Sequence, residues 1–188
     1  MSGSLRYITA FLTILVVLTL NNVSARETLD MTISANILNN PCIIEMSSAT
    51  VLLPDIDEAT LAASVLTPTD YGSDVSFMVD VKDCEDDTLT ALNLSFQPKN
   101  GTFPPGFNQV FNNDISASNQ GAMGVGVVIF YHGSQENVLK SDGSSNVIIP
   151  ATQSDYKKSY QFDARYQKIG SVSVGPVAAT LTINVTYQ

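Results

Sequence analysis

The most regular alternation of apolar and polar positions lies between residues 29 and 37, where every second residue is apolar. The apolar positions are Leu29, Met31, Ile33, Ala35 and Ile37. Successive side chains of a strand point to opposite faces, so a period of two predicts a β-strand with one apolar and one polar face. The last residues repeat the pattern with Leu181, Ile183, Val185 and Tyr187, followed by Gln188. Both strands need a partner, and we expect a neighbouring chain to supply one.

The rest of the chain reads as short strands separated by turns. Alternation or apolar runs predict strands over 42–53 with a break at Ser47 and Ser48, and over 75–81, 91–96, 122–131, 160–166 and 178–187. Clusters of Pro, Gly, Asn, Asp and Ser lie between them. Only residues 57–66 have a helix-like composition. About seven short strands without a long helical period predict a sandwich of two antiparallel sheets.

An N-terminal leader precedes the first strand. Arg6 gives the positive flank, an apolar run of about 14 residues follows, and Val23, Ser24 and Ala25 provide small residues for cleavage. The run is shorter than the roughly 20 residues that a membrane-spanning helix needs. We therefore expect residues 1–25 to be a signal peptide and the mature chain to be exported. An uncleaved anchor is the alternative.

Length and charge restrict the classes of function. Removing 25 of the 188 residues leaves 163, the size of one domain with its own core. The net charge of −9 becomes −10, because Arg6 is the only charged residue in the leader. Nucleic acid is therefore an unexpected partner, since binding to phosphates needs clustered Lys and Arg. An acidic exported protein is instead kept dispersed by its own charge.

The chain has two cysteines, Cys42 and Cys84, and both lie in the mature part. Exported thiols meet an oxidising compartment, which predicts one disulfide between them. Closing a loop of about 43 residues contributes on the order of 4 kcal/mol by restricting the unfolded chain. The alternative is a pair of metal ligands, but no CxxC or HxxH motif accompanies them. The sequence predicts neither a metal nor another cofactor.

The sequence contains few residues that are suited to catalysis. His132 is the single histidine, so a Ser/His/Asp arrangement would have to include it; its place in a turn favours an ordinary solvated side chain. Acidic clusters at 55–58 and 83–87 leave paired carboxylates open, although such clusters at strand ends are usually just solvated. A calcium site at 85–87 lacks the spaced ligands and the glycine of a known loop. We expect no enzymatic activity; a secreted β-sandwich enzyme is the alternative.

Several stretches, taken in order, resemble the pilin subunits of chaperone–usher fimbriae, close to the type 1 pilus group. They are the alternating segment that runs into Asn40-Pro41-Cys42, FMVDVKDC at 77–84, GVGVVI at 124–129, FDARY at 162–166 with Gly170 after it, and the alternating end with its penultimate tyrosine. Each stretch is weak alone. Their order and spacing are specific, and the resemblance covers nearly all of the mature chain.

The resemblance implies an incomplete immunoglobulin-like sandwich that lacks its C-terminal strand and carries an N-terminal donor strand. Residues 26–40 would be the donor-strand extension, with Leu29, Met31, Ile33, Ala35 and Ile37 as donor residues, and residues 41–188 the pilin domain. The final strand, with Leu181, Ile183, Val185, Tyr187 and the Gln188 carboxylate, would form the acceptor groove and contact a chaperone. Such strand addition combines main-chain hydrogen bonds with side-chain pockets.

The resemblance also implies partners and a location. Neighbouring pilin subunits would form a linear polymer, a periplasmic chaperone and an outer-membrane usher would assemble it, and the fimbrium would stand on the bacterial surface and serve adhesion. A host receptor is a further partner if the chain is a minor or adaptor pilin with a receptor-binding role. The family usually has glycine where Ala35 stands. The extra methyl bears on which groove the strand prefers.

Overall fold

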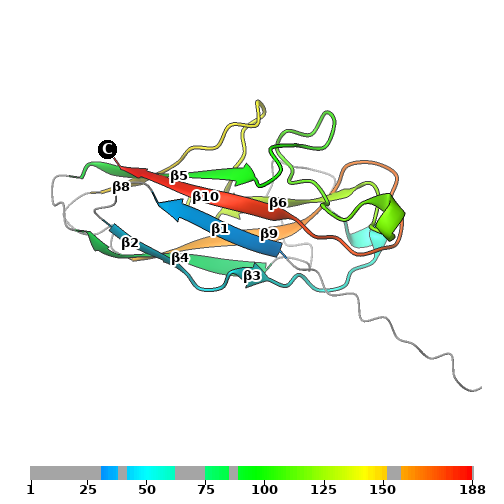
Figure 1. Cartoon of the computed structure of the whole chain (residues 1–188), viewed down its shortest axis with the longest axis horizontal. Coiled ribbons are helices and arrows are strands. Elements are labelled where there is room, and N and C mark those ends of the chain that lie inside the picture. Colours follow the sequence, from blue (N-terminus) through cyan, green and yellow to red (C-terminus); the bar gives the residue numbers. More distant parts are fainter. Residues whose placement is uncertain (1–30, 38–41, 62–74, 85–88, 152–157, 188) are drawn as a thin grey trace, which may run out of the picture.

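The computed structural model describes residues 31–37, 42–61, 75–84, 89–151 and 158–187. These residues form an almost entirely β structure (Figure 1). The strands are β1 (Met31–Ile37), β2 (Cys42–Met46), β3 (Thr50–Val51), β4 (Val75–Cys84), β5 (Ala91–Pro98), β6 (Val125–Tyr131), β7 (Glu136–Asn137), β8 (Val147–Pro150), β9 (Ser159–Lys168) and β10 (Thr180–Tyr187). Two 3₁₀ turns, η2 (Glu58–Thr60) and η3 (Ala117–Asn119), are the helical elements of the described part.

The strands form two five-stranded sheets. One sheet has the order β3-β1-β10-β5-β8 and the other β2-β4-β9-β6-β7. All pairings in the described part are antiparallel except that of β1 with β10, which is parallel. The prediction of a two-sheet β-sandwich is therefore confirmed. The sheet formed by β3, β1, β10, β5 and β8 is called the β10 sheet below, and the other the β9 sheet.

The core between the sheets follows from the alternation in the strands. Phe77, Val79 and Val81 of β4 are at most 2% exposed, as the period of two in this stretch predicted. The rings of Phe77 and Phe162 stack with centroids 5.6 Å apart, and Phe96 from the opposite sheet lies 5.0 Å from Phe162. Aromatic contacts thus join the two layers at their centre.

The predicted strand over 42–53 changes sheet at its predicted break. β2 belongs to the β9 sheet and β3 to the β10 sheet. Ser47 donates its backbone N–H to Met78, while the Ser48 hydroxyl and the Thr50 backbone bond to each other. These bonds satisfy the backbone where the ladder is interrupted. The Ser47-Ser48 signal therefore marks the corner at which one strand crosses from one layer to the other.

Two expectations need adjustment. The helix-like segment contains only the short η2 turn within its described part, and residues 62–66 lie outside the described residues. The strands β7 and β8 were not predicted. β7 has two residues, too few for a periodic signal, and β8 is an unbroken apolar run that ends in Pro150. In the described residues, no helix has the length and apolarity required to cross a bilayer.

The outer face of the β9 sheet carries a second, smaller core. Val110, Val128 and Phe130 are buried there, with Phe107 and Ile169 packed against them. Arg165 is 1% exposed on the same face, and its guanidinium lies 4.9 Å from the centroid of the Phe130 ring. Phe107 and Val110 belong to a loop that ends at Phe111, which forms an isolated antiparallel bridge with Val127 of β6. A position that strand alternation assigns to solvent is therefore covered by a loop.

Candidate functional site

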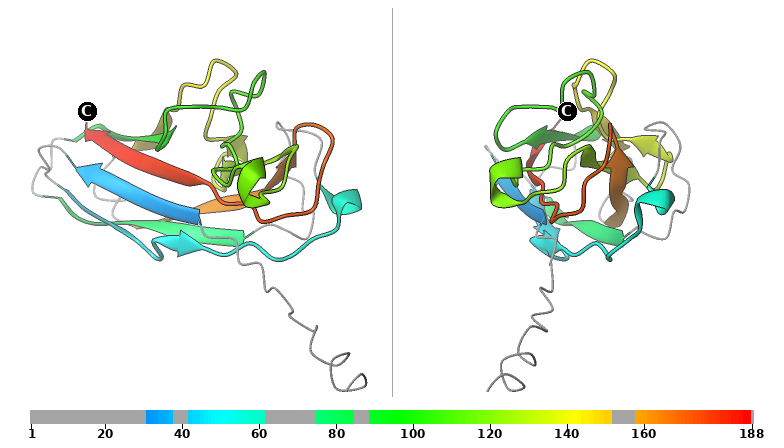
Figure 2. Two further views of the ribbon diagram at one scale, coloured as in Figure 1. Left: turned by 45° about the vertical axis from the view of Figure 1, so that its right-hand side comes forward. Right: turned by 90° about the vertical axis from the view of Figure 1, so that its right-hand side faces the viewer.

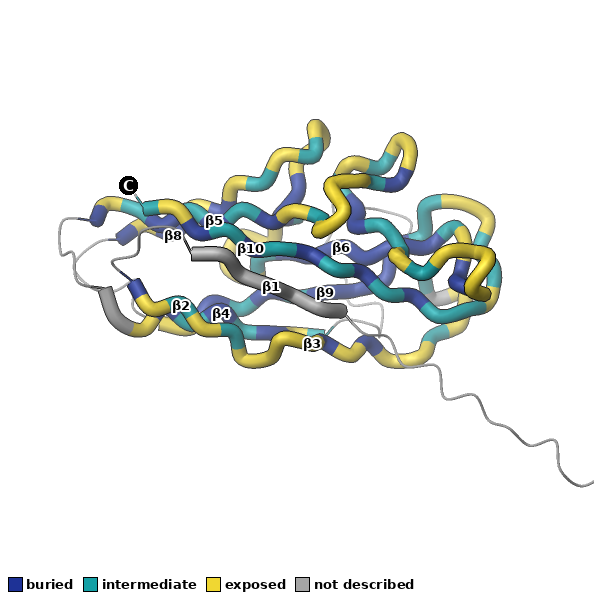
Figure 3. The backbone as a smooth tube through the Cα atoms, viewed as in Figure 1, coloured by how far each residue is buried: buried dark blue, intermediate teal, exposed yellow. Residues whose placement is uncertain are grey.

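The last strand, β10, presents its apolar residues to the core. Leu181, Ile183 and Val185 are 0%, 1% and 4% exposed, while the two residues between them are half-buried (Figure 3). Tyr187 is half-buried at the end of the strand, and burial raises the pKa of its hydroxyl. Gln188 lies outside the described residues. The predicted groove residues from 181 to 187 thus share one strand, with three of them fully in the core.

On one side β10 pairs with β5. The antiparallel register places Leu181 opposite Pro98, Ile183 opposite Phe96 and Val185 opposite Leu94. This pairing occupies one row of backbone hydrogen-bonding groups along β10. The other row faces away from β5, and an unpaired row at a sheet edge readily accepts another strand.

On its other side β10 pairs with β1, the predicted donor strand (Figures 1 and 2). The register is parallel, with Ile33 level with Leu181, Ala35 with Ile183 and Ile37 with Val185. The apolar set of β1 is therefore level with the inward-facing residues of β10. Beyond β1, Met31 pairs with Val51 of the short β3. Leu29 lies outside the described residues.

The body of the domain supplies β10 with one neighbour in the described structure, β5. Its second neighbour is the N-terminal segment, and β3 stands on the far side of that segment. If β1 were removed, a gap one strand wide would lie between β10 and β3 in this sheet. The cysteines lie on the other sheet, where the register places Cys42 opposite Cys84 and Cys42 is disulfide-bonded.

A cavity of about 600 Å³ lies at the end of the sandwich where the chain enters β10. Its lining includes Leu61, Tyr166 and Val177, with Asp55 and Glu58 among the polar residues. Burial and then the charge of Asp55 raise the pKa of Tyr166 to about 12. Lys168 and Glu58 form an ion pair at 3.0 Å. The acidic cluster at 55–58 therefore includes a paired carboxylate at the rim of an apolar cavity.

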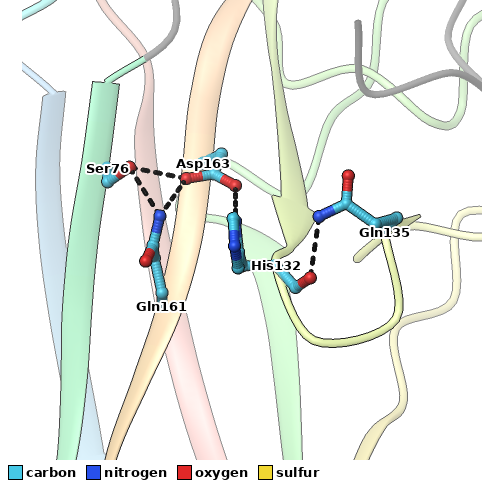
Figure 4. Close-up of polar contacts among 5 residues, drawn as sticks. All are labelled: Ser76, His132, Gln135, Gln161 and Asp163. Atoms are coloured by element: carbon cyan, nitrogen blue, oxygen red, sulfur yellow. Dashed lines mark hydrogen bonds and ion pairs between the residues drawn. The ribbon is translucent and has the colours of Figure 1, made fainter.

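His132 does not form a catalytic triad with the serine and aspartate next to it (Figure 4). Its Nδ1 lies 2.7 Å from Asp163 Oδ2, and the Ser76 hydroxyl donates to Asp163 Oδ1 at 2.6 Å. A triad needs the serine hydroxyl bonded to the imidazole, so that the histidine takes its proton. Here serine and histidine both bond to the carboxylate. The histidine side chain is 53% exposed in a turn after β6, as the sequence indicated.

This network predicts a pH dependence. Burial alone would raise the pKa of Asp163, but hydrogen bonds from Ser76, Gln161 and His132 hold it below its ordinary value. A depressed pKa stabilises the folded chain above the ordinary pKa of an aspartate, and this stabilisation is lost as pH falls through the lowered value. Urea unfolding near pH 7 and below about pH 3 should show a smaller acid loss for Asp163→Asn than for the unchanged chain. Equal losses would contradict the network's role.

The comparisons with known proteins support the interpretation from the residues. The chain matches the fimbrial protein family over residues 30–188. It is also 29% identical over 171 residues to the uncharacterized fimbrial-like protein YadK of Escherichia coli (strain K12), with 85% of each chain covered. The chain belongs to the fimbrial protein family. This membership confirms the predicted resemblance and points to a structural or adhesive surface protein rather than an enzyme.

Among solved structures, the chain is similar to the CupB6 tip adhesin from Pseudomonas aeruginosa. The likeness has a TM-score of 0.44 at 13% identity and covers 86% of this chain. The chain spans 40% of the length of that adhesin.

Proposed function

We propose that the chain is a structural subunit of an adhesive fimbria that polymerises by donor-strand complementation. Residues 1–25 are the signal peptide, residues 26–40 the donor extension and residues 41–188 the pilin domain. The extension of one subunit fills the gap beside β10 of its neighbour. The observation that carries this proposal is that β10 has one neighbour from the body of the domain and a register on its other side that suits an alternating apolar strand.

The gap accepts a strand from another molecule more freely than from its own chain. Four residues, 38–41, separate β1 from β2 in the sequence, so the connection restricts how the chain's own strand enters. A neighbour's strand has no such tether and can enter antiparallel to β10. Antiparallel pairing is slightly more stable per residue than parallel pairing. Exchange of the chain's own strand for a neighbour's therefore favours polymer over monomer.

The burial of donor side chains sets the strength of the contact between two subunits. Four large donor side chains at about 1.5–3 kcal/mol each contribute about 6–12 kcal/mol before the cost of ordering the segment. Export through the periplasm exposes the unfilled gap before assembly. A periplasmic chaperone that lends a strand, with the Gln188 carboxylate as an anchor, and an outer-membrane usher complete the proposed pathway to the cell surface.

Replacing Ile33 by Asp should reduce assembly strongly. Within one chain Ile33 is level with Leu181, which is 0% exposed, and in either strand direction position 33 belongs to the apolar set of the alternation. The variant therefore brings a carboxylate to an apolar position, and an unpaired buried charge is costly. The matched control is Ser34→Asp, which adds the same charge to the polar set of the alternation. Polymer length and yield, measured by electron microscopy and gel filtration, should fall for Ile33→Asp and change little for the control. Equal yields from the two variants would contradict the groove.

A further inference from the structure

A second cavity lies at the opposite edge of the sandwich from the gap beside β10. It is about 550 Å³ in volume and lies between β7, the outer strand of the β9 sheet, and β8, the outer strand of the β10 sheet. The strand β5 separates β8 from β10. A ligand in this cavity would therefore not compete with strand addition, and the inference drawn from it stands apart from the proposed polymerisation.

Uncharged polar groups and apolar side chains both line the cavity. The amide side chains are those of Gln109, Gln135, Asn137 and Asn146. The accessible apolar lining is Ile148, which is 53% exposed, and the half-buried Tyr131, while Val138, Leu139 and Val147 are at most 9% exposed. Glu136 and Lys140 contribute one charge of each sign. The surface therefore combines amide donors and acceptors with apolar contact area and has little net charge.

The amides are held in place by the backbone. Asn137 donates its Nδ2 to the Gln109 carbonyl at 3.0 Å, and Gln109 donates its Nε2 to the Leu139 carbonyl at 3.2 Å. The Leu139 N–H in turn donates to Asn137 Oδ1 at 2.9 Å. Fixed polar groups lose little conformational entropy when a ligand binds, which is the character of a preorganised site.

Gln135 adds an independent sign of a built site. Its φ of +58° lies in the left-handed region, which costs a residue with a side chain about 1–2 kcal/mol. Glycine would fit this turn without strain. The side chain instead donates its Nε2 to the His132 carbonyl at 2.7 Å (Figure 4). Strained residues of this kind cluster at binding sites, and Gln135 lines the cavity.

We propose that this cavity binds a neutral oligosaccharide through the rim formed by the amides. Sugar hydroxyls both donate and accept, which matches amide side chains, and the C–H faces of sugar rings match the apolar surface of Ile148 and Tyr131. The volume lies within the roughly 300–1,000 Å³ of sites for small molecules. Glu136 and Lys140 balance each other at the rim, so the negative net charge of the chain, −9 over the full sequence, disfavours acidic sugars. The class of ligand is therefore a neutral glycan, which gives a fimbrial subunit its own contact with a surface.

An extended peptide is the competing occupant, since both strands are sheet edges. β7 has two residues and β8 has four, ending in Pro150, and proline provides no N–H for a ladder. Strand addition gains its affinity from a row of backbone hydrogen bonds. The edges of β7 and β8 offer only a short row of such groups. The polar side chains at the rim are the larger source of contacts.

The test uses the full mature chain as a monomer on an array of neutral and sialylated oligosaccharides, followed by titration of the best ligand. The key variant is Gln135→Gly, which removes the side chain and relieves the backbone. Its matched control is Gln120→Gly, because Gln120 also has a positive φ, of 63°, and does not line the cavity. Both variants should keep a melting temperature close to that of the unchanged chain.

We expect binding to neutral glycans, weaker binding to their sialylated forms, and a roughly tenfold loss of affinity for Gln135→Gly alone. Absence of binding to every neutral glycan would overturn the proposal. So would equal affinity of Gln135→Gly and the control, a preference for sialylated forms, or binding of an extended peptide in place of sugars. Polymerisation is measured separately on the Ile33 variants, so failure of one proposal is distinguishable from failure of the other.

Discussion

A chain that lacks residues 26–38 will be recovered in complex with its chaperone but will not attach itself to the preceding subunit. The deletion removes the whole of β1, whose register with β10 runs from Thr32 to Ile37. The gap beside β10 stays intact, because β5 and β3 belong to the part of the chain that remains. The truncated subunit therefore accepts a strand and donates none, so it ends every polymer in which it is incorporated.

The experiment co-expresses each form with a candidate chaperone and compares complexes and polymers by gel filtration and electron microscopy. The unchanged mature chain is the control for assembly. A synthetic peptide of residues 26–40 is the control for the gap, since it should displace the chaperone from the truncated subunit and give a stable one-to-one complex. A truncated chain that is stable alone, without chaperone or peptide, would contradict the unfinished sandwich.

How much of this structure the sequence could predict depends on how local the signal is. The strands of the sandwich follow from alternation, because one face of each strand meets the core; β10 is buried at each of Leu181, Ile183 and Val185. The order of strands in the sheets needs contacts between distant residues. His132 was rightly placed in a turn, but its bond to Asp163 joins positions 31 residues apart, which no local pattern predicts.

Burial on the outer face of the β9 sheet was beyond sequence reasoning for the same reason. Arg165 alternates with inward-facing residues of β9 and so belongs to the outward set, yet it is 1% exposed. Phe107 and Val110, from a loop more than fifty residues earlier, belong to the small core on this face. The cavity between β7 and β8 likewise depends on two short edge strands that carry no periodic signal.

The gap beside β10 and the cavity between β7 and β8 have different chemistry. Beside β10 the inward positions are apolar, and the sequence supplies an alternating apolar strand that fits their register. Between β7 and β8 the rim is polar and the strands are short. A fimbrial subunit must remain joined to its neighbours and still present a surface to the outside. Under the two proposals, the gap beside β10 would hold the polymer together while the cavity between β7 and β8 would stay accessible.

Both sites are built on the strands that enclose the aromatic core, so Phe162→Ala should have a large effect on stability. Phe162 is 0% exposed, and its ring lies 5.6 Å from Phe77, 5.0 Å from Phe96 and 5.3 Å from Tyr131. Truncation removes contacts with both sheets and leaves a cavity, so the free energy of unfolding should fall by about 3–5 kcal/mol. Urea denaturation of the full mature monomer, followed by circular dichroism, measures it.

The matched control is Phe103→Ala, because Phe103 is partly buried and only packs against the edge of the same core. Its loss should be well below that of Phe162→Ala, since less area returns to water. Phe96 is paired with Ile183 of β10, so the Phe162 cavity also loosens the floor beside the gap. Donor exchange should therefore be faster in Phe162→Ala than in the control. Equal stability and equal exchange rates in the two variants would show that the core does not support the gap.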